Sequence, residues 1–172
     1  LRGGETGLVF KDTFLSQIQK LNPFVTQNIA EELIKRLESI PPTIEGNLTA
    51  WEYLKGLKQV FVPIEKRERD VRFLDTTKIT NNTFHVTDEF SYTNGNKTVR
   101  ADAVFLINGI PVFIAETKAA HKIDGIAEAL EQIRRYHNEA PEVMAILQIY
   151  TLTHLIRYFY GATWNTSRKG LF

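Results

Sequence analysis

Residues 103–115 form a stretch of the chain that is almost entirely apolar. Asp102 precedes this stretch, and Glu116 and Lys118 follow it. Two apolar runs within it flank Asn108-Gly109, which is the pattern of a β-hairpin whose strands are both buried. The three ionisable residues fall at the open end of this hairpin. Because a buried charge is costly unless it is paired or bound to an ion, their position indicates a functional site.

The register of the hairpin decides whether the two carboxylates share one face of the sheet. Side chains alternate between faces along a strand, so Glu116 and Lys118 lie on the same face. A strict two-residue turn would place Asp102 on the other face. A three-residue loop or one β-bulge restores the match. We therefore predict that the corner at residues 108–110 is not a plain two-residue turn.

Two carboxylates that share a site repel each other unless a cation lies between them. Mg²⁺ suits such a site because it binds oxygen ligands at roughly 2.1 Å and keeps water and substrate phosphate in its shell. A metal-bound water is then the nucleophile, and Lys118 would orient it and stabilise the developing charge. In the alternative interpretation, Asp102 caps the hairpin beside Arg100, Glu116 forms a surface ion pair and Lys118 is solvated.

The segment also resembles a known family. D…E-x-K on a hairpin is the signature of the PD-(D/E)xK nucleases. The run R-A-D-A-V-F-L-I-N-G-I-P-V-F-I-A-E-T-K is similar to the N-terminal nuclease domain of the restriction (R) subunit of type I restriction-modification enzymes. The Q-x-x-x-Y motif of Gln132 and Tyr136, N-N-x-F at residues 81–84 and Y-G-A-T-W ending at Trp164 add to this resemblance.

The resemblance implies an α/β fold with a restriction-endonuclease-like core, in which a mixed β-sheet is flanked by helices. It implies a type I site-specific deoxyribonuclease that hydrolyses DNA after ATP-driven translocation by motor domains further along the full-length chain. Asp102, Glu116 and the backbone carbonyl of Thr117 would hold Mg²⁺, and Gln132 and Tyr136 would support the site and contact DNA. The sequence has no G-x-x-x-x-G-K-[ST] motif, so ATP would be bound outside it.

Two arginines are candidate contacts for the DNA backbone. Arg100 flanks the site and Arg134 lies on the helix that carries Gln132; an ordinary solvent-facing arginine is the alternative for each. The mixed charge run at residues 65–70 is interpreted as a solvated loop, with a DNA contact as the alternative. Many relatives carry a metal-supporting glutamate on a helix upstream of the core. Glu31 and Glu32 are the nearest acids on a predicted helix here, but their segment better matches a later helix of the family.

Length and composition set the remaining expectations. The 172 residues fit a single nuclease domain, residues 1–172, expected to be the N-terminal part of a larger chain. A net charge of +1 does not by itself argue for nucleic acid. The absence of cysteine excludes disulfides and thiolate metal sites, and no apolar run approaches the ~18 residues of a membrane span. The resemblance to type I restriction enzymes, and not the composition, implies a cytoplasmic protein that binds double-stranded DNA and the modification and specificity subunits.

Two other functions stay open at this point. The chain could be a non-catalytic DNA-binding or assembly module of the same fold, or another PD-(D/E)xK nuclease that acts in DNA repair or on junctions. Apolar spacing and turn residues predict an irregular start over residues 1–7; helices over 10–21, 26–39, 47–57 and 124–138; and strands over 59–63, 71–74, 83–87, 89–92, 98–99, 143–149 and 155–160, besides the central hairpin.

Overall fold

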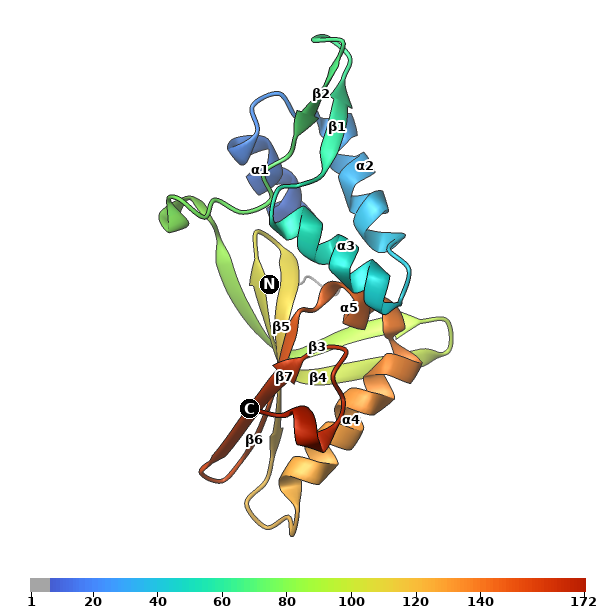
Figure 1. Ribbon diagram of the computed structural model, residues 1–172, viewed down its shortest axis with the longest axis vertical. Helices are drawn as coiled ribbons and strands as arrows, with labels where there is room; N and C mark the ends of the chain where they lie inside the picture. Colours follow the sequence, from blue (N-terminus) through green and yellow to red (C-terminus); the bar gives the residue numbers. More distant parts are fainter. Residues whose placement is uncertain (1–6) are drawn as a thin grey trace.

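The computed structural model describes residues 7–172, so the irregular start predicted for residues 1–7 lies, apart from Gly7, outside the described residues. The molecule is elongated, with a helical end and a sheet end (Figure 1). The helical end comprises α1 (Lys11–Leu21), α2 (Gln27–Glu38), α3 (Ile44–Leu54) and the projecting hairpin of β1 (Gln59–Val62) and β2 (Arg67–Asp70). Among residues 7–172, no helix has the length and apolarity needed to cross a bilayer.

The first two N-terminal helices form where the apolar spacing predicts them. Ile29, Leu33 and Leu37 make one buried stripe along α2, and Thr26 caps its N-terminus by accepting the N–H of Ile29. The third helix begins earlier than predicted because Thr43 provides a second cap of the same kind.

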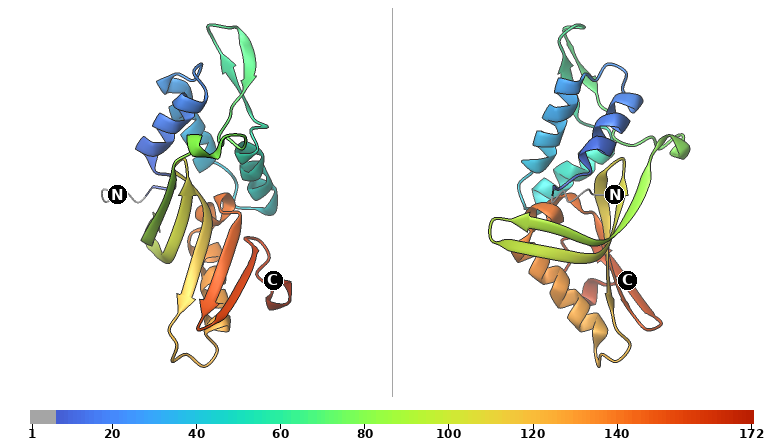
Figure 2. Two further views of the ribbon diagram at one scale, coloured as in Figure 1. Left: turned by 90° about the vertical axis from the view of Figure 1, so that its left-hand side faces the viewer. Right: turned by 180° about the vertical axis from the view of Figure 1, so that it is seen from behind.

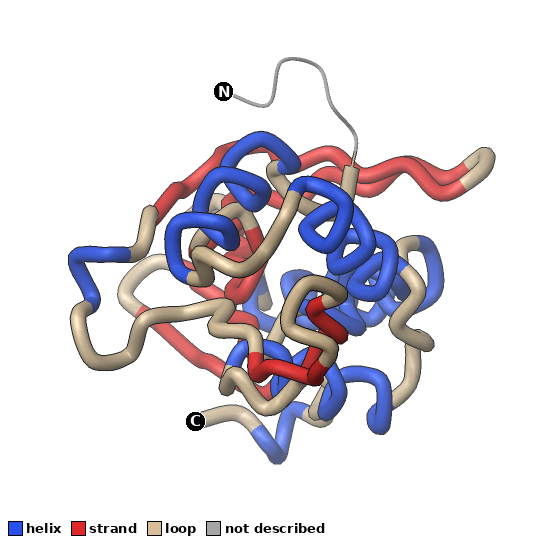
Figure 3. Tube along the Cα trace, turned by 90° about the horizontal axis from the view of Figure 1, so that it is seen from above, coloured by secondary structure: helices blue, strands red, loops and turns tan. Residues whose placement is uncertain are grey.

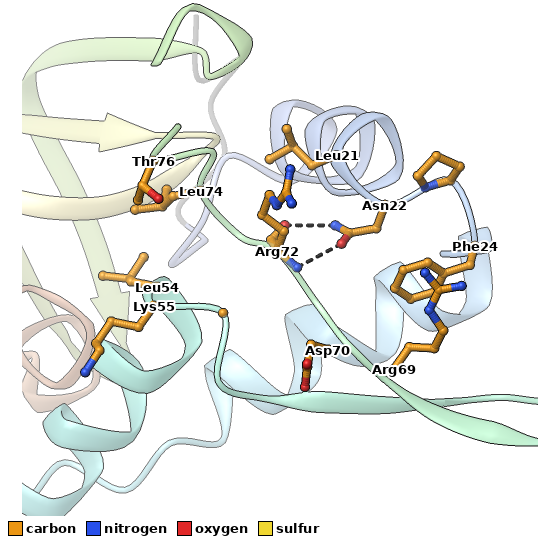
Figure 4. A pocket seen from close by; sticks show the side chains of 12 residues that line it. Leu21, Asn22, Phe24, Leu54, Lys55, Arg69, Asp70, Arg72, Leu74 and Thr76 are labelled. Carbon is orange, nitrogen blue, oxygen red and sulfur yellow. Dashed lines mark hydrogen bonds between the residues drawn. The ribbon is translucent and has the colours of Figure 1, made fainter. Parts of the chain in front are cut away.

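The region after α3 corrects two predictions. Residues 67–70, predicted to be a loop, form β2 and pair antiparallel with β1. Their side chains are mostly exposed, so no apolar alternation marks the strand. Residues 71–74, predicted to be a strand, are irregular. Here the side chain of Asn22 bonds both backbone groups of Arg72 at 2.8 Å, at the edge of a pocket between α1, α3 and β2 (Figure 4).

The sheet end confirms the predicted fold class, an α/β restriction-endonuclease-like core. Its strands are β3 (Phe84–Asn94), β4 (Lys97–Ile107), β5 (Ile110–Lys118), β6 (Ile149–His154) and β7 (Arg157–Ala162), in that order. Only β5 and β6 are parallel, and α4 (Gly125–Glu139) and α5 (Pro141–Ile146) connect them. The outer part of the β3–β4 hairpin projects to one side (Figures 2 and 3).

The predicted strand over residues 143–149 is wrong, because residues 143–146 belong to α5 and the strand begins at Ile149. Pro141 starts this short helix at its first turn, where the missing N–H costs nothing. The run V-M-A-I-L is buried throughout, and a continuous apolar run does not distinguish a buried strand from a buried helix. The last strand is shifted with it, to residues 157–162.

The central hairpin forms, but its corner differs from the prediction. Ile107 pairs with Ile110, and Asn108 and Gly109 have φ of 52° and 82°, so the corner is a two-residue turn of the type that suits hairpins. The predicted irregularity is a β-bulge further along. It leaves Val112 without a paired residue on β4 and restores the register to Ala103 opposite Ala115. This register puts Asp102 and Glu116 opposite each other on one face.

The Asn108 side chain anchors this corner to the rest of the molecule. It is 2% exposed, its amide donates to the carbonyl of Phe73 at 2.8 Å and to Oδ1 of Asn82 at 2.9 Å, and its oxygen accepts the N–H of Thr83 at 2.8 Å. Asn82 belongs to the N-N-x-F motif. The motif and the turn therefore form one buried polar network, in which each group depends on the others.

Asn108→Ala is expected to lower the free energy of unfolding by about 3 kcal/mol, because it leaves buried backbone groups unpaired and places alanine at a positive φ. Urea unfolding followed by circular dichroism measures this. Asn96→Ala, in the exposed turn of the β3–β4 hairpin, is the control and should change stability by less than about 0.5 kcal/mol. Equal effects of the two variants would contradict the anchoring role.

Candidate active site

The candidate site lies where β4 and β5 part. The two strands pair only as far as Ala103 and Ala115, after which β4 continues with β3 while β5 continues with β6. The two strands therefore diverge (Figure 1), and the β4-facing edge of residues 116–118 has no strand partner within residues 7–172; this edge is hereafter the notch. Helix α4 packs against β5 and β6 and brings its own side chains to this notch.

Asp102 lies at the mouth of the notch and is half-buried. Its Oδ2 accepts the backbone N–H of Thr117 at 2.7 Å and is 3.2 Å from the Thr117 hydroxyl. The N–H and C=O groups of a strand residue point to the same edge, so the Thr117 carbonyl also faces the notch. The Asp102 carboxylate thus accepts the N–H that a neighbouring strand would otherwise bind, and the Thr117 carbonyl lies on the same edge as this carboxylate.

Glu116 is completely buried. Its Oε1 accepts a hydrogen bond from the Tyr136 hydroxyl at 2.9 Å, whereas its Oε2 has no hydrogen-bond partner among residues 7–172 and lies 3.8 Å from Nζ of Lys118. Burial and the neighbouring Asp102 carboxylate raise the pKa of Glu116 from 4.5 to about 7, against the opposing effects of Tyr136 and Lys118. A buried acceptor without a partner is what a bound cation would satisfy.

A chain of hydrogen bonds on α4 holds the base of the site. Nζ of Lys118 donates to Oε1 of Gln132, whose Nε2 donates to the Tyr136 hydroxyl at 2.6 Å. Gln132 and Tyr136 are four residues apart and share one face of the helix. Tyr136 reaches both Glu116 and the carbonyl of Arg100, the latter at 2.6 Å. The helix therefore connects the lysine to the buried carboxylate.

Tyr136 has one hydrogen for two acceptors. Burial and the Glu116 carboxylate raise the pKa of its phenol, so it stays protonated and can donate fully to only one of them at a time. The carbonyl of Arg100 is a contact that the sequence could not indicate, because a backbone oxygen carries no residue signature.

The structure places the two candidate DNA-binding arginines away from the carboxylates. The exposed Arg100 guanidinium lies 3.4 Å from Glu89, so at the site this residue contributes only its carbonyl. The Arg134 guanidinium bonds the carbonyl of Thr166 and the carboxylate of Glu131. The upstream acids Glu31 and Glu32 lie on α2, where they bond neighbours on that helix, Gln27 and Arg36.

The donors at the notch fit a hard divalent cation. Two carboxylates and one backbone carbonyl are oxygen ligands of the kind Mg²⁺ binds, and one carboxylate oxygen is buried without a partner. Within residues 7–172 there is no cluster of three acidic, histidine or cysteine side chains with metal-binding geometry, so the carbonyl and water would complete the coordination.

A mixed sheet with this topology, flanked by α4 and α5, defines the chain as a protein with a restriction-endonuclease-like core. Comparison with known families identifies the branch. The family described as type I restriction enzyme R protein N terminus matches residues 2–169, and the chain belongs to this family. The resemblance inferred from the D…E-x-K hairpin and its neighbouring motifs is thereby confirmed.

Two relatives in Methanocaldococcus jannaschii show the extent of the similarity. The putative type I restriction enzyme MjaVIIP endonuclease subunit is 39% identical over 98 residues, which are 56% of this chain and 9% of the relative. The putative MjaIXP endonuclease subunit is 26% identical over 162 residues, which are 90% of this chain and 16% of the relative. The chain thus spans less than a fifth of either relative.

Proposed function

We propose that this chain is the nuclease domain of a type I restriction enzyme R subunit and that it hydrolyses DNA phosphodiester bonds with the help of Mg²⁺. The observation that carries the proposal is the meeting of Asp102, Glu116 and Lys118 in one notch, where an oxygen of Glu116 is buried without a hydrogen-bond partner. Family membership and the names of the relatives support the same function.

Each residue has a separate task in this proposal. Asp102, Glu116 and the carbonyl of Thr117 would hold the metal, which when bound supplies a Lewis acid and a water of lowered pKa. Lys118 is directed into the notch by its hydrogen bond to Gln132, where its ammonium orients the attacking water and offsets the negative charge that grows on the phosphoryl oxygens. A compact ammonium suits a charge that is not planar.

The wider assembly is part of the same proposal. The resemblance to type I enzymes implies cutting after translocation, so motor domains elsewhere in a full-length R subunit would hydrolyse ATP, and modification and specificity subunits would select the site. The substrate is double-stranded DNA, and the compartment is the cytoplasm. The names of the relatives, putative type I restriction enzyme endonuclease subunits, support the assignment to a restriction enzyme.

A metal titration tests the proposal. Isothermal titration with Mn²⁺ or Mg²⁺ at pH 8, where Glu116 is ionised, should show binding by the wild type, and Asp102→Asn should weaken it at least about tenfold because one of two carboxylate ligands is lost. Asp88→Asn, an exposed acid on the neighbouring strand β3, is the control and should bind as the wild type does. A wild type that neither binds these ions nor cuts DNA would favour the non-catalytic DNA-binding or assembly module.

A further inference from the structure

Helix α4 is held on two sides. One side carries Gln132 and Tyr136 into the candidate site. Against the other lies the segment formed by residues 163–170, hereafter the strap, which follows β7 and includes the end of the Y-G-A-T-W motif (Figure 1). Neither the nuclease chemistry nor the sheet pairing accounts for this segment, so its contacts indicate what it does.

Arg134 makes the central contact between α4 and the strap. Its Nε and Nη2 both donate to the carbonyl of Thr166, at 3.2 and 2.7 Å, and its Nη1 bonds Glu131. Hydrogen bonds from a charged donor are about twice as strong as neutral ones. All three nitrogens of the guanidinium thus have partners within the molecule, and two of the three hold the strap.

Further contacts fix the strap along the helix. The carbonyl of Thr163 bonds Nε2 of His137 at 2.8 Å, and the ring of Trp164 packs edge-on against the ring of His137 with centroids 4.8 Å apart. Near the start of α4, Arg168 pairs with Asp124 at 2.9 Å. Asp124 also caps the helix through the N–H of Ala127, so the strap spans α4 from its first turn to its last.

The strap is also tied to the sheet. The hydroxyl of Tyr150, a fully buried residue of β6, donates to the carbonyl of Asn165 at 2.6 Å. The strap therefore clamps α4 against the parallel strand next to β5. A small displacement of catalytic groups has a large effect on rate, up to about a hundredfold for 1 Å.

We propose that the strap positions α4 for catalysis, with Arg134 as the positioning residue whose grip on the Thr166 carbonyl keeps Gln132 and Tyr136 against Lys118 and Glu116. This inference rests on the proposed nuclease function. It assigns Arg134 a role that differs from DNA binding, and the two roles predict different measurements.

Three substitutions that each remove one positive charge test the proposal: Arg134→Met, Arg168→Met and Lys169→Met. Arg134→Met should lower kcat about tenfold while the Kd for DNA, measured with Ca²⁺ in place of Mg²⁺, changes less than about twofold and its salt dependence is unchanged. Native-state hydrogen exchange should become faster in α4 and not in α1–α3. Arg168→Met should act in the same direction with a smaller effect, because its ion pair is exposed.

Lys169→Met is the matched control, since Lys169 lies in the strap but its side chain is exposed; its kcat, Kd and exchange should equal those of the wild type. Arg134→Lys restores the charge but not the forked geometry, so its kcat should stay low. The proposal is overturned if Arg134→Met raises the Kd, reduces the slope of log Kd against log salt concentration by about one, and leaves kcat unchanged. That is the pattern expected on losing a phosphate contact. Faster exchange in α4 with an unchanged kcat would also overturn it. A wild type that does not cut DNA would instead refute the proposed function.

Discussion

Lys118→Met is expected to lower kcat for DNA cleavage by about a thousandfold while metal binding and DNA binding persist. Removing one group that stabilises transition-state charge costs about 10²–10³ in kcat, and here the same ammonium would also orient the attacking water. The lysine is not a metal ligand, and its side chain is 16% exposed, so methionine can occupy the space without a new buried charge. Single-turnover cleavage at saturating DNA and Mg²⁺ measures the chemical step.

Lys122→Met is the comparison for this experiment. Lys122 lies four residues further along, is well exposed and pairs with Glu128 at 2.9 Å, so its loss should change kcat by less than about threefold, as expected for a surface ion pair. If Lys118→Met and Lys122→Met had the same small effect, the lysine of the D…E-x-K pattern would have no part in the chemistry.

In metal-free buffer the wild-type protein is expected to lose stability as the pH rises from about 5 to 8. The pKa of Glu116 is 4.5 in the unfolded chain and about 7 when folded, so between these values the folded state binds more protons and the free energy of unfolding falls as the pH rises. Because one pKa unit corresponds to 1.36 kcal/mol, the loss attributable to Glu116 is about 3 kcal/mol and is complete above the folded pKa.

Glu116→Gln isolates this effect, because an amide resembles the protonated acid and does not titrate. The difference in unfolding free energy between this variant and the wild type, measured by urea unfolding with EDTA present, should grow in favour of the variant as the pH rises and reach about 3 kcal/mol near pH 8. Saturating Mg²⁺ should reduce the difference, because only the wild type would retain both carboxylate ligands. A difference that does not vary with pH would contradict the raised pKa.

The central hairpin and the helices with clear apolar stripes could be predicted from the sequence because their signals are local. Alternation, a turn dipeptide and a capping threonine depend on neighbouring residues alone. An irregularity in the hairpin is predicted because Asp102 and Glu116 can share one face only if the register shifts by one residue. The structure contains such a bulge, but at Val112 and not at the corner.

The rest depends on contacts between distant segments. Strand β2 is held by backbone pairing with β1 and by ion pairs of Arg67 and Arg69 with Glu65, which leave no apolar pattern. The short helix α5 and a buried strand have the same composition, so only the packing around residues 143–146 distinguishes them. The Arg100 carbonyl and the strap on Arg134 are tertiary contacts, and residue type gave no indication of either.

The bulge at Val112 has a consequence for chain length. Because it shifts the pairing by one residue, it sets how many residues must separate the two acids for both to arrive at the same face of the sheet. A single insertion or deletion between them would turn one carboxylate away, whereas a change of two residues, one in each strand, would keep them together. The number of residues between Asp102 and Glu116 is therefore constrained, and variation in loop length has to occur elsewhere in the chain.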